Sequence, residues 1–220
     1  MANSPGRRAA SRTSVLDGDP AEVEQRILRR GLDAFAELGY NATTVRVLAH
    51  RLGVSHNFIS VRYGSKLAFW RAVVDFASAE VLEFDGPAFG DDYDDDQDLI
   101  VAAVRKIYRK SAHLPQLHRI VADEAARESE RLDYLFERYI QPFMENVEPS
   151  IERLVAKGVM PPVPMHLLYF AVMGPTSGLI QQPLARRFGR PEPSSDEDDL
   201  HYGQVLAGLV LTGIMQRPTA

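Results

Sequence analysis

The chain has 220 residues, of which 45% are hydrophobic and 25% are charged, and its formal net charge is -5. These proportions are ordinary for a soluble globular protein with room for one large domain or a small and a larger one. The absence of cysteine excludes disulfide bonds, thiolate metal sites and a cysteine nucleophile.

No segment indicates a membrane or secretory destination. The longest apolar run, Val205–Met215, is too short for a transmembrane helix, which needs about 20 residues. The amino-terminal end is basic, but it lacks the apolar stretch of a secretory signal. We therefore expect a cytoplasmic protein with no membrane partner.

Positive charge is concentrated near the amino terminus, although the chain as a whole is acidic. Residues 1–71 carry 11 basic and 6 acidic side chains, a balance of +5, whereas the remainder carries 14 and 24, a balance of -10. No Asp or Glu occurs between Glu37 and Asp75. The basic residues in that interval are Arg46, Arg51, Arg62, Lys66 and Arg71. This asymmetry predicts that one end of the protein meets a polyanion.

The spacing of apolar residues predicts an all-α fold, because it follows helical periodicity and gives no alternation typical of strands. Residues 1–19 are small, polar and basic, as in a disordered arm. Helices are expected over 20–38, 44–51, 55–62, 66–81, 98–112, 116–127, 131–157, 165–188 and 199–216. Bends are expected in two of the long helices, at Pro142, Pro149, Pro175 and Pro183.

Two short helices around a glycine turn indicate a helix-turn-helix motif. Gly53 permits the positive φ of the turn. Thr43 or Thr44 is expected to cap the helix before it, Ser55 the helix after it, and Ser65 the longer helix that follows.

The motif also predicts an inner and an outer face. The small Ala49 lets the second helix cross the first closely. The expected inner contacts join Val54 and Ile59 to Leu48 and Leu52. His56, Asn57 and Ser60 then face outward, where a DNA major groove could receive them.

The segment from Arg26 to Ala72 resembles the TetR family of transcriptional regulators. The matching positions are Phe35, Gly39, Tyr40, Thr43, Thr44, Gly53, Val54, Ser55, Ser65 and Lys66. The resemblance implies an N-terminal helix-turn-helix DNA-binding domain at 20–66, after the arm at 1–19, and a helical ligand-binding and dimerisation domain at 67–220. It implies a ligand-responsive, sequence-specific regulator, most simply a repressor released from a palindromic double-stranded operator by a small apolar or aromatic molecule.

The resemblance also implies roles for individual residues in DNA binding. Thr44 and Lys66 lie at helix N-termini and would hold phosphates. Ser55, His56 and Asn57 are candidates for base contacts. The predicted DNA-binding set is completed by Arg46, Ser60, Arg62 and Tyr63. Tyr63 can equally pack under the fourth helix, and Arg7, Arg8 and Arg12 can equally form a DNA-contacting arm or an idle tail.

Three residues depart from the family pattern and leave the operator open. Family members often have glycine at Asn57, tyrosine at Ser60 and histidine at Arg62. Asn57 adds bulk where backbone often approaches DNA, and Ser60 loses an aromatic phosphate contact. Arg62 could replace a contact with a stronger one.

The carboxyl-terminal part is expected to form a homodimer through its last helices, which the resemblance makes a four-helix bundle. The predicted interface residues are Phe170, Gly174, Gly178, Val205, Leu206, Leu209, Val210 and Gly213, and the alternative for this stripe is an ordinary core. The predicted effector site comprises Tyr108, His113, Leu117, Phe136, Tyr139, Phe143, Tyr169 and Met173, although such a stripe is more often core than pocket. His113, His118 and Arg131 could orient a polar group of the ligand, and no cofactor or metal is expected.

Two other classes of function compete with a regulator. An enzyme is disfavoured because HExxH and G-x-S-x-G motifs are absent. The spacing of Asp92, Asp94 and Asp96 suits a calcium loop, but Gln97 and Ala103 replace residues that such a loop needs. A helical interaction or small-molecule-binding module without DNA binding is the second alternative, and the acid-free interval disfavours it.

Overall fold

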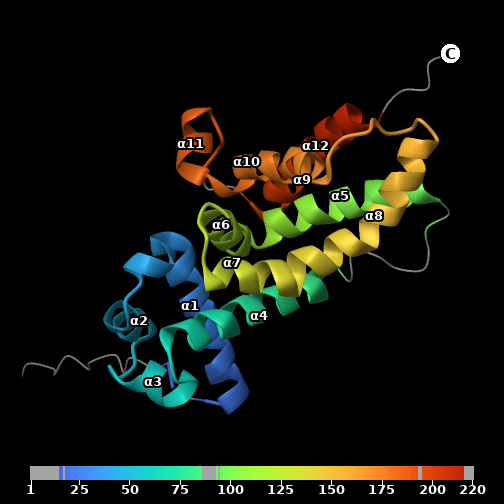
Figure 1. The fold of residues 1–220 in the computed structure, drawn as a ribbon. Helices are drawn as coiled ribbons and strands as arrows, with labels where there is room; N and C mark the ends of the chain where they lie inside the picture. The colour runs from blue at the N-terminus through green and yellow to red at the C-terminus, as the bar shows by residue number, and fades with distance from the viewer. Residues whose placement is uncertain (1–14, 17, 86–92, 94, 193–194, 216–220) are drawn as a thin grey trace, which may run out of the picture. The chain divides into compact units, whose positions relative to one another are not determined.

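A computed structural model describes residues 15–16, 18–85, 93, 95–192 and 195–215 (Figure 1). Within these ranges every regular element is helical, which confirms the all-α prediction. The chain divides into two compact units, Met1–Phe76 and Ala77–Ala220, and the division falls inside helix α4. The expected arm, with Arg7, Arg8 and Arg12, lies almost wholly outside the described residues.

The amino-terminal unit comprises α1 (Pro20–Ala42), α2 (Val45–Leu52), α3 (Phe58–Tyr63) and the first part of α4 (Lys66–Asp85). Its core consists of side chains that are at most 2% exposed: Ile27, Leu32, Phe35, Leu48, Leu52, Ile59, Phe69, Trp70, Val73 and Val74. Helices α1 and α4 approach closely at Gly31, where an added Cβ would lie 2.6 Å from Phe69 Cζ and 2.8 Å from Val73 Cγ2. Only glycine fits this crossing.

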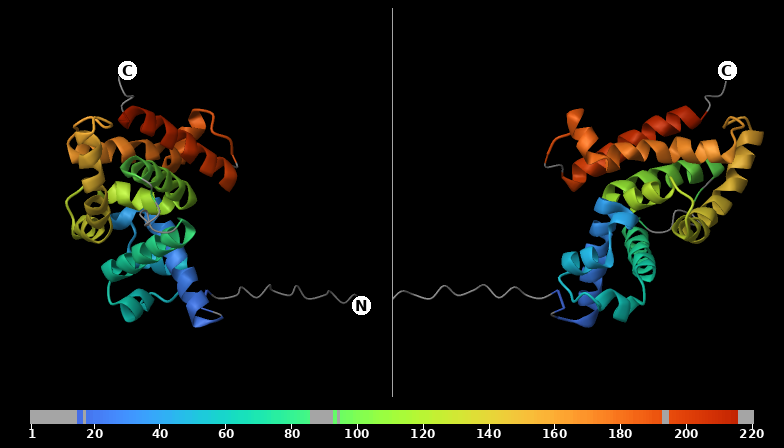
Figure 2. Two further views of the ribbon diagram at one scale, coloured as in Figure 1. Left: turned by 90° about the vertical axis from the view of Figure 1, so that its right-hand side faces the viewer. Right: turned by 60° about the vertical axis from the view of Figure 1, so that its left-hand side comes forward.

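The second unit contains the rest of α4 and the helices that follow it (Figure 2). These are α5 (Asp96–His113), α6 (Pro115–Glu124), α7 (Glu130–Leu135), the π-helical turn η1 (Phe136–Ile140), α8 (Gln141–Ala156), α9 (Met165–Met173), the 3-10 turn η2 (Gly174–Thr176), α10 (Ser177–Ile180), α11 (Gln182–Arg187) and α12 (Asp196–Ile214). Helix α5 packs along both α8 and α12. An added Cβ at Gly203 of α12 would lie 3.0 Å from the Tyr108 carbonyl oxygen of α5, so this crossing is also close.

The prolines act differently at different places. The expected helix 131–157 changes from α-helical to π-helical geometry at η1, and Pro142 lies in the first turn of α8, directly after this π-helical turn. Pro149 lies inside α8 without ending it. The expected helix 165–188 is broken at η2, which contains Pro175, and again at Gln181, before Pro183 in α11.

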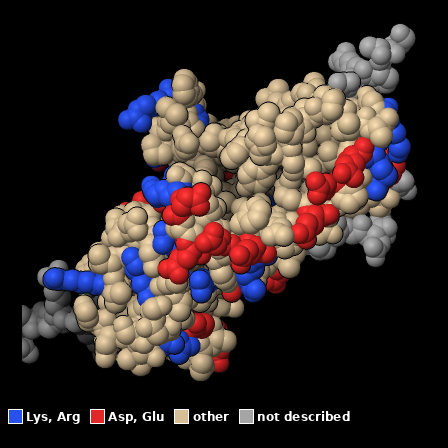
Figure 3. Space-filling view, in the orientation of Figure 1, with Lys and Arg blue, Asp and Glu red and all other residues tan. Residues whose placement is uncertain are grey.

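Acidic side chains gather along two helices of the second unit (Figure 3). On the face drawn in Figure 3, acidic side chains follow α7 and α8, while Lys and Arg side chains are spread over the amino-terminal unit. Exposed acids from α7 to α8 are Glu130, Asp133, Glu137, Glu145, Glu148 and Glu152. No helix in the described part of the chain combines the length and apolar character that crossing a membrane requires.

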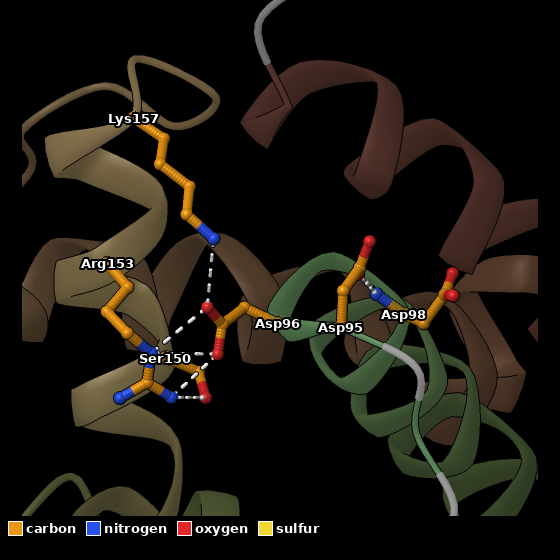
Figure 4. A network of polar contacts seen from close by, with 6 residues as sticks. All are labelled: Asp95, Asp96, Asp98, Ser150, Arg153 and Lys157. Carbon is orange, nitrogen blue, oxygen red and sulfur yellow. Dashed lines mark hydrogen bonds and ion pairs between the residues drawn. The ribbon is translucent and has the colours of Figure 1, made fainter.

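One carboxylate joins the start of α5 to the end of α8 (Figure 4). Asp96 accepts hydrogen bonds from Arg153 Nε at 3.0 Å and from Lys157 Nζ at 3.4 Å, and Arg153 also donates to Ser150 Oγ at 2.9 Å. The hydrogen bond from Arg153 holds the pKa of Asp96 far below its ordinary value. Asp92 and Asp94 of the suspected calcium loop lie outside the described residues. Within those residues no group of three or more His, Cys, Asp or Glu side chains could hold a metal ion.

The Asp96 cluster predicts a pH-dependent contribution to stability. Because the folded-state pKa lies below the unfolded value, the contribution is complete above the ordinary carboxyl pKa of about 4 and is lost as the pH falls below it. We expect Asp96→Asn to lower the thermal unfolding midpoint of the second unit at pH 7. The gap from wild type should begin to narrow below about pH 4 and should continue to narrow at still lower pH, as followed by circular dichroism. Asp98→Asn, in the same helical turn, is the control and should keep the wild-type pH profile; a constant gap for Asp96→Asn would contradict the prediction.

Candidate nucleic-acid interface

The first helix and the turn of the motif form as predicted. The Thr44 hydroxyl accepts a hydrogen bond from the Val47 N–H at 3.2 Å and so caps α2. Gly53 has φ 70° and ψ 33°, in the left-handed region, and ends α2. Thr43, the other candidate cap, is buried instead and donates its hydroxyl to the Gly39 carbonyl oxygen at 2.6 Å. Thr44 therefore starts the motif, and Thr43 ties it to α1.

The second helix begins later than expected, and the prediction that Ser55 caps it was wrong. The Ser55 hydroxyl donates to Asn57 Oδ1 at 2.9 Å, and the Ser55 carbonyl accepts from the Phe58 N–H at 3.0 Å. These local bonds favour a turn over a helical start. Residues 55–57 are therefore a turn that leads into α3, rather than its first turn.

The inner and outer faces of α3 are clearly separated. Ile59 is fully buried, as are Leu48 and Leu52 of α2, which agrees with the predicted inner face. The exposed residues on this turn and helix are Ser55, His56, Asn57, Ser60, Val61 and Arg62. Val61 is 77% exposed and was missed in the sequence. Helical spacing could have found it, because its N–H bonds to the Asn57 carbonyl one turn earlier.

The start of α4 is fixed to the end of α1. The Ser65 hydroxyl accepts from the Ala68 N–H at 3.0 Å, which confirms it as a cap. Lys66 donates to the Tyr40 carbonyl oxygen at 3.1 Å, and its Nζ lies 3.9 Å from the centre of the Tyr40 ring. Lys66 thus has a structural role in the absence of DNA, while Thr44 and Arg46 are exposed.

Arg62 and Tyr63 converge on one carboxylate of α1. Arg62 Nε donates to Glu24 Oε2 at 2.8 Å, and the Tyr63 hydroxyl donates to Glu24 Oε1 at 2.8 Å. The bond to Glu24 raises the pKa of Arg62, while burial, aided by Glu24, raises that of Tyr63. The Tyr63 ring lies 4.7 Å from the ring of Phe69, so it does pack under α4.

A second α1 carboxylate reaches another of the basic residues. Arg51 Nη2 donates to Glu37 Oε1 at 2.9 Å. The interval between Glu37 and Asp75 is thus free of acids in sequence, but Glu24 and Glu37 reach its arginines in space. Helical periodicity places both glutamates on the polar side of α1, yet it does not identify their partners.

The predicted dimer residues divide into outward and inward groups. Phe170 is 61% exposed, Val205 48% and Leu209 67%, and Gly174, Gly178 and Gly213 are also exposed. Leu206 and Val210, by contrast, are partly buried and pack against the core of the second unit.

The predicted effector residues are not all free to meet a ligand. Tyr108 is fully buried and donates its hydroxyl to the Val172 carbonyl oxygen at 2.6 Å, and Leu117 is also buried. The His113 ring stacks on Phe84 with centres 3.7 Å apart. Phe136 is 48% exposed, and the remaining members are partly buried: Tyr139, Phe143, Tyr169 and Met173.

His118 and Arg131, which were expected to orient the effector, are enclosed by other parts of the protein. Arg131 Nε lies 2.9 Å from Oε2 of the buried Glu124. Burial lowers the pKa of His118 to about 4, so this side chain is neutral near pH 7. Arg131 thus compensates a buried charge, which makes it a structural residue in the absence of a ligand.

Comparison with known proteins confirms the resemblance found in the sequence. Residues 27–73 match the family model for bacterial regulatory proteins of the tetR family. No curated protein matches the chain.

Solved structures of TetR regulators share the fold over most of the chain. The TetR family transcriptional regulator PfmR from Thermus thermophilus is 20% identical, covering 87% of this chain and 97% of its own, with a TM-score of 0.61. The ketosteroid transcriptional regulator KstR2 of Mycobacterium tuberculosis is 18% identical, covering 88% and 95%, with a TM-score of 0.57. FadR from Bacillus subtilis, in complex with stearoyl-CoA, is 12% identical, covering 86% and 98%, with a TM-score of 0.58. The chain thus has the fold and the amino-terminal domain of a TetR-family transcriptional regulator.

The Thr44 cap predicts a measurable loss of stability in the amino-terminal unit. Thr44→Ala removes the acceptor for the Val47 N–H and should cost about 1 kcal/mol, whereas Thr44→Ser keeps the oxygen and should remain near wild type. Trp70 is the single tryptophan of the chain and is fully buried in this unit, so its fluorescence during urea unfolding reports on the unit directly. Equal midpoints for the Ala and Ser variants would contradict the capping role.

Proposed function

We propose that the protein is a homodimeric, ligand-responsive transcriptional regulator that binds a specific double-stranded DNA operator, most simply as a repressor. The observation that carries this proposal is the α2–turn–α3 motif, whose inner face is buried and whose outer face presents polar side chains. The same segment matches the tetR family model. This proposed function is binding rather than catalysis. We expect the protein in the cytoplasm, where it would meet the DNA.

The proposed DNA contacts divide into backbone and base contacts. Thr44 and the exposed Arg46 lie at the start of α2, where free backbone N–H groups add to their attraction for phosphates. Lys66 holds the start of α4 and can also face a phosphate. Ser55, His56, Asn57 and Ser60 are exposed around α3 and would meet base edges in the major groove. Arg62 and Tyr63 would add backbone contacts.

A DNA-binding experiment tests this division of roles. An operator is first selected from random duplexes, and binding is then followed by fluorescence anisotropy across salt concentrations. Arg46→Ala should weaken binding to all sequences and reduce the salt slope by about 0.9, as for one lost phosphate contact. Asn57→Ala should cost about 1–3 kcal/mol on the operator and little on random DNA. The control is Arg105→Ala, which removes an exposed arginine of α5 and should leave the affinities for operator and random DNA unchanged. If no sequence is selected from the random duplexes, the proposed function is overturned.

The exposed apolar side chains of α9 and α12 support dimer formation. Phe170 and Leu209 are both mostly exposed, and an isolated monomer gains nothing by placing such side chains in water. At Gly174 and Gly213 an added Cβ would meet no atom within 4 Å, which leaves space in which a second helix can approach. A short motif reads few base pairs, so two copies on a two-fold operator would supply the required specificity.

Substitution on this face should separate the dimer. Leu209→Glu places a charge where the second copy is proposed to pack, so a monomer is expected at micromolar concentration by sedimentation velocity. Leu82→Glu is a matched control, because Leu82 is 52% exposed and lies on α4. It should leave the dimer intact. A dimeric Leu209→Glu variant would exclude this part of α12 from the interface.

The proposed effector is a small apolar or aromatic molecule that binds in the second unit. Partly buried aromatic and thioether side chains there, Tyr139, Phe143, Tyr169 and Met173, support this chemistry. Two similar structures are those of a ketosteroid transcriptional regulator and of a regulator in complex with stearoyl-CoA, whose stearoyl chain is apolar. Helix α4 belongs to both units, so a shift of this helix would couple effector binding to DNA binding. A coupling free energy of about 1–3 kcal/mol between the two sites is sufficient for regulation.

A further inference from the structure

The carboxylate of Glu24 receives donors from two neighbouring residues of α3. Arg62 approaches Oε2 through both Nε, at 2.8 Å, and Nη2, at 2.6 Å, while the Tyr63 hydroxyl donates to Oε1 at 2.8 Å. Both carboxylate oxygens are therefore occupied. Arg62 lies 38 residues and Tyr63 39 residues after Glu24 in the sequence, and all three belong to the amino-terminal unit.

This arrangement of donors is that of an anion site. A guanidinium edge and a hydroxyl that converge on one oxyanion are equally suited to a carboxylate and to a phosphate. The Arg62 side chain is 48% exposed and that of Glu24 is 29% exposed, so solvent and a ligand can reach the pair. The site adjoins the turn and helix that carry the proposed base contacts.

Arg62 cannot offer the same edge to two anions at once. Its Nε and Nη2 atoms form the edge that faces Glu24, and that edge is the one best suited to a bidentate contact with a phosphate. Moreover, a carboxylate beside a bound phosphate repels it. Full use of Arg62 by DNA therefore requires that Glu24 be displaced.

We infer that Glu24 is an internal competitor for DNA, whose carboxylate occupies the phosphate site formed by Arg62 and Tyr63 and lowers affinity for every DNA sequence. This inference rests on the proposed function and identifies a residue outside the helix-turn-helix motif that sets the strength of DNA binding. Because the exchange takes place at a phosphate contact, the penalty applies equally to the operator and to other DNA and sets the overall affinity. The arrangement depends on arginine at position 62 and on the hydroxyl of Tyr63.

The chain contains its own matched control. Glu37 also lies on α1 and pairs with an arginine, Arg51, but that arginine belongs to α2 and is not among the proposed DNA contacts. Glu37→Gln thus makes the same change of charge and also frees a guanidinium. A difference in DNA affinity between Glu24→Gln and Glu37→Gln therefore comes from the position of the glutamate and not from the net charge of the protein.

The test is a double-mutant cycle on DNA affinity with full-length protein. Wild type, Glu24→Gln, Arg62→Ala and the double variant are titrated against the selected operator and against random duplex DNA, at several salt concentrations. Glu24→Gln should tighten binding to both DNAs, by roughly threefold or more at low salt, and should steepen the salt slope by about 0.9 as one phosphate contact is gained. In the Arg62→Ala background the same change should have no effect, and Glu37→Gln should leave the slope unchanged. Circular dichroism and Trp70 fluorescence establish that each variant is folded.

Each contrary result has a distinct meaning. Weaker binding by Glu24→Gln would show that Glu24 supports the DNA-bound arrangement, which overturns the inference. Tightening that persists without Arg62, or that Glu37→Gln reproduces, would reduce the effect to net charge and also overturn it. Wild-type protein that binds neither operator nor random DNA would instead overturn the proposed function, and the inference with it.

Discussion

A helix of six residues is not stable alone in water, so α3, the helix proposed to read DNA bases, exists only because its inner side is buried. Ile59 is its fully buried residue, and it shares the core of the amino-terminal unit with Leu48 and Leu52 of α2. That core in turn depends on the close crossing of α1 and α4 at Gly31, where no side chain fits. The position of every exposed residue on α3 follows from this packing. A change in the buried set would therefore alter DNA binding without touching the DNA.

The charges of the amino-terminal unit are balanced locally rather than simply positive. Arginines on α2 and α3 each face a glutamate on α1, through the Arg51–Glu37 and Arg62–Glu24 pairs. Exposed pairs of this kind contribute only about 0–1 kcal/mol to stability, so they do little to hold the fold. The Glu24 carboxylate has a larger effect on DNA binding, because it neutralises Arg62, which is proposed to contact a phosphate. The Arg62–Glu24 pair is therefore proposed to matter more for recognition than for folding.

The sequence predicted the parts of the motif that depend on local chemistry. Gly53, with its positive φ, and the caps Thr44 and Ser65 are each fixed by bonds to residues one to four positions away, which a sequence pattern can capture. The start of α3 was misjudged because Ser55 has a competing local partner, the amide of Asn57. Glu24 was not recognised because periodicity assigns a residue to a face and says nothing of which distant side chain meets it. For the same reason Tyr108 fitted a ligand site and a core equally well, until its bond to Val172 placed it in the core.

Two of the three departures from the family pattern, Asn57 and Arg62, share one feature in the structure. Asn57 is held by Ser55 and Arg62 by Glu24, so two side chains proposed to meet DNA have partners before DNA arrives. Both interactions are solvent-exposed and contribute little to stability, so DNA groups can replace the present partners. Exchange of these partners for DNA is therefore favourable where phosphates and bases lie in the right positions. It is much less favourable where only the phosphates do, since Asn57 then loses Ser55 without gaining a base edge. Prior engagement of Asn57 by Ser55 thus raises the penalty for a wrong sequence, even though it lowers affinity for the right one.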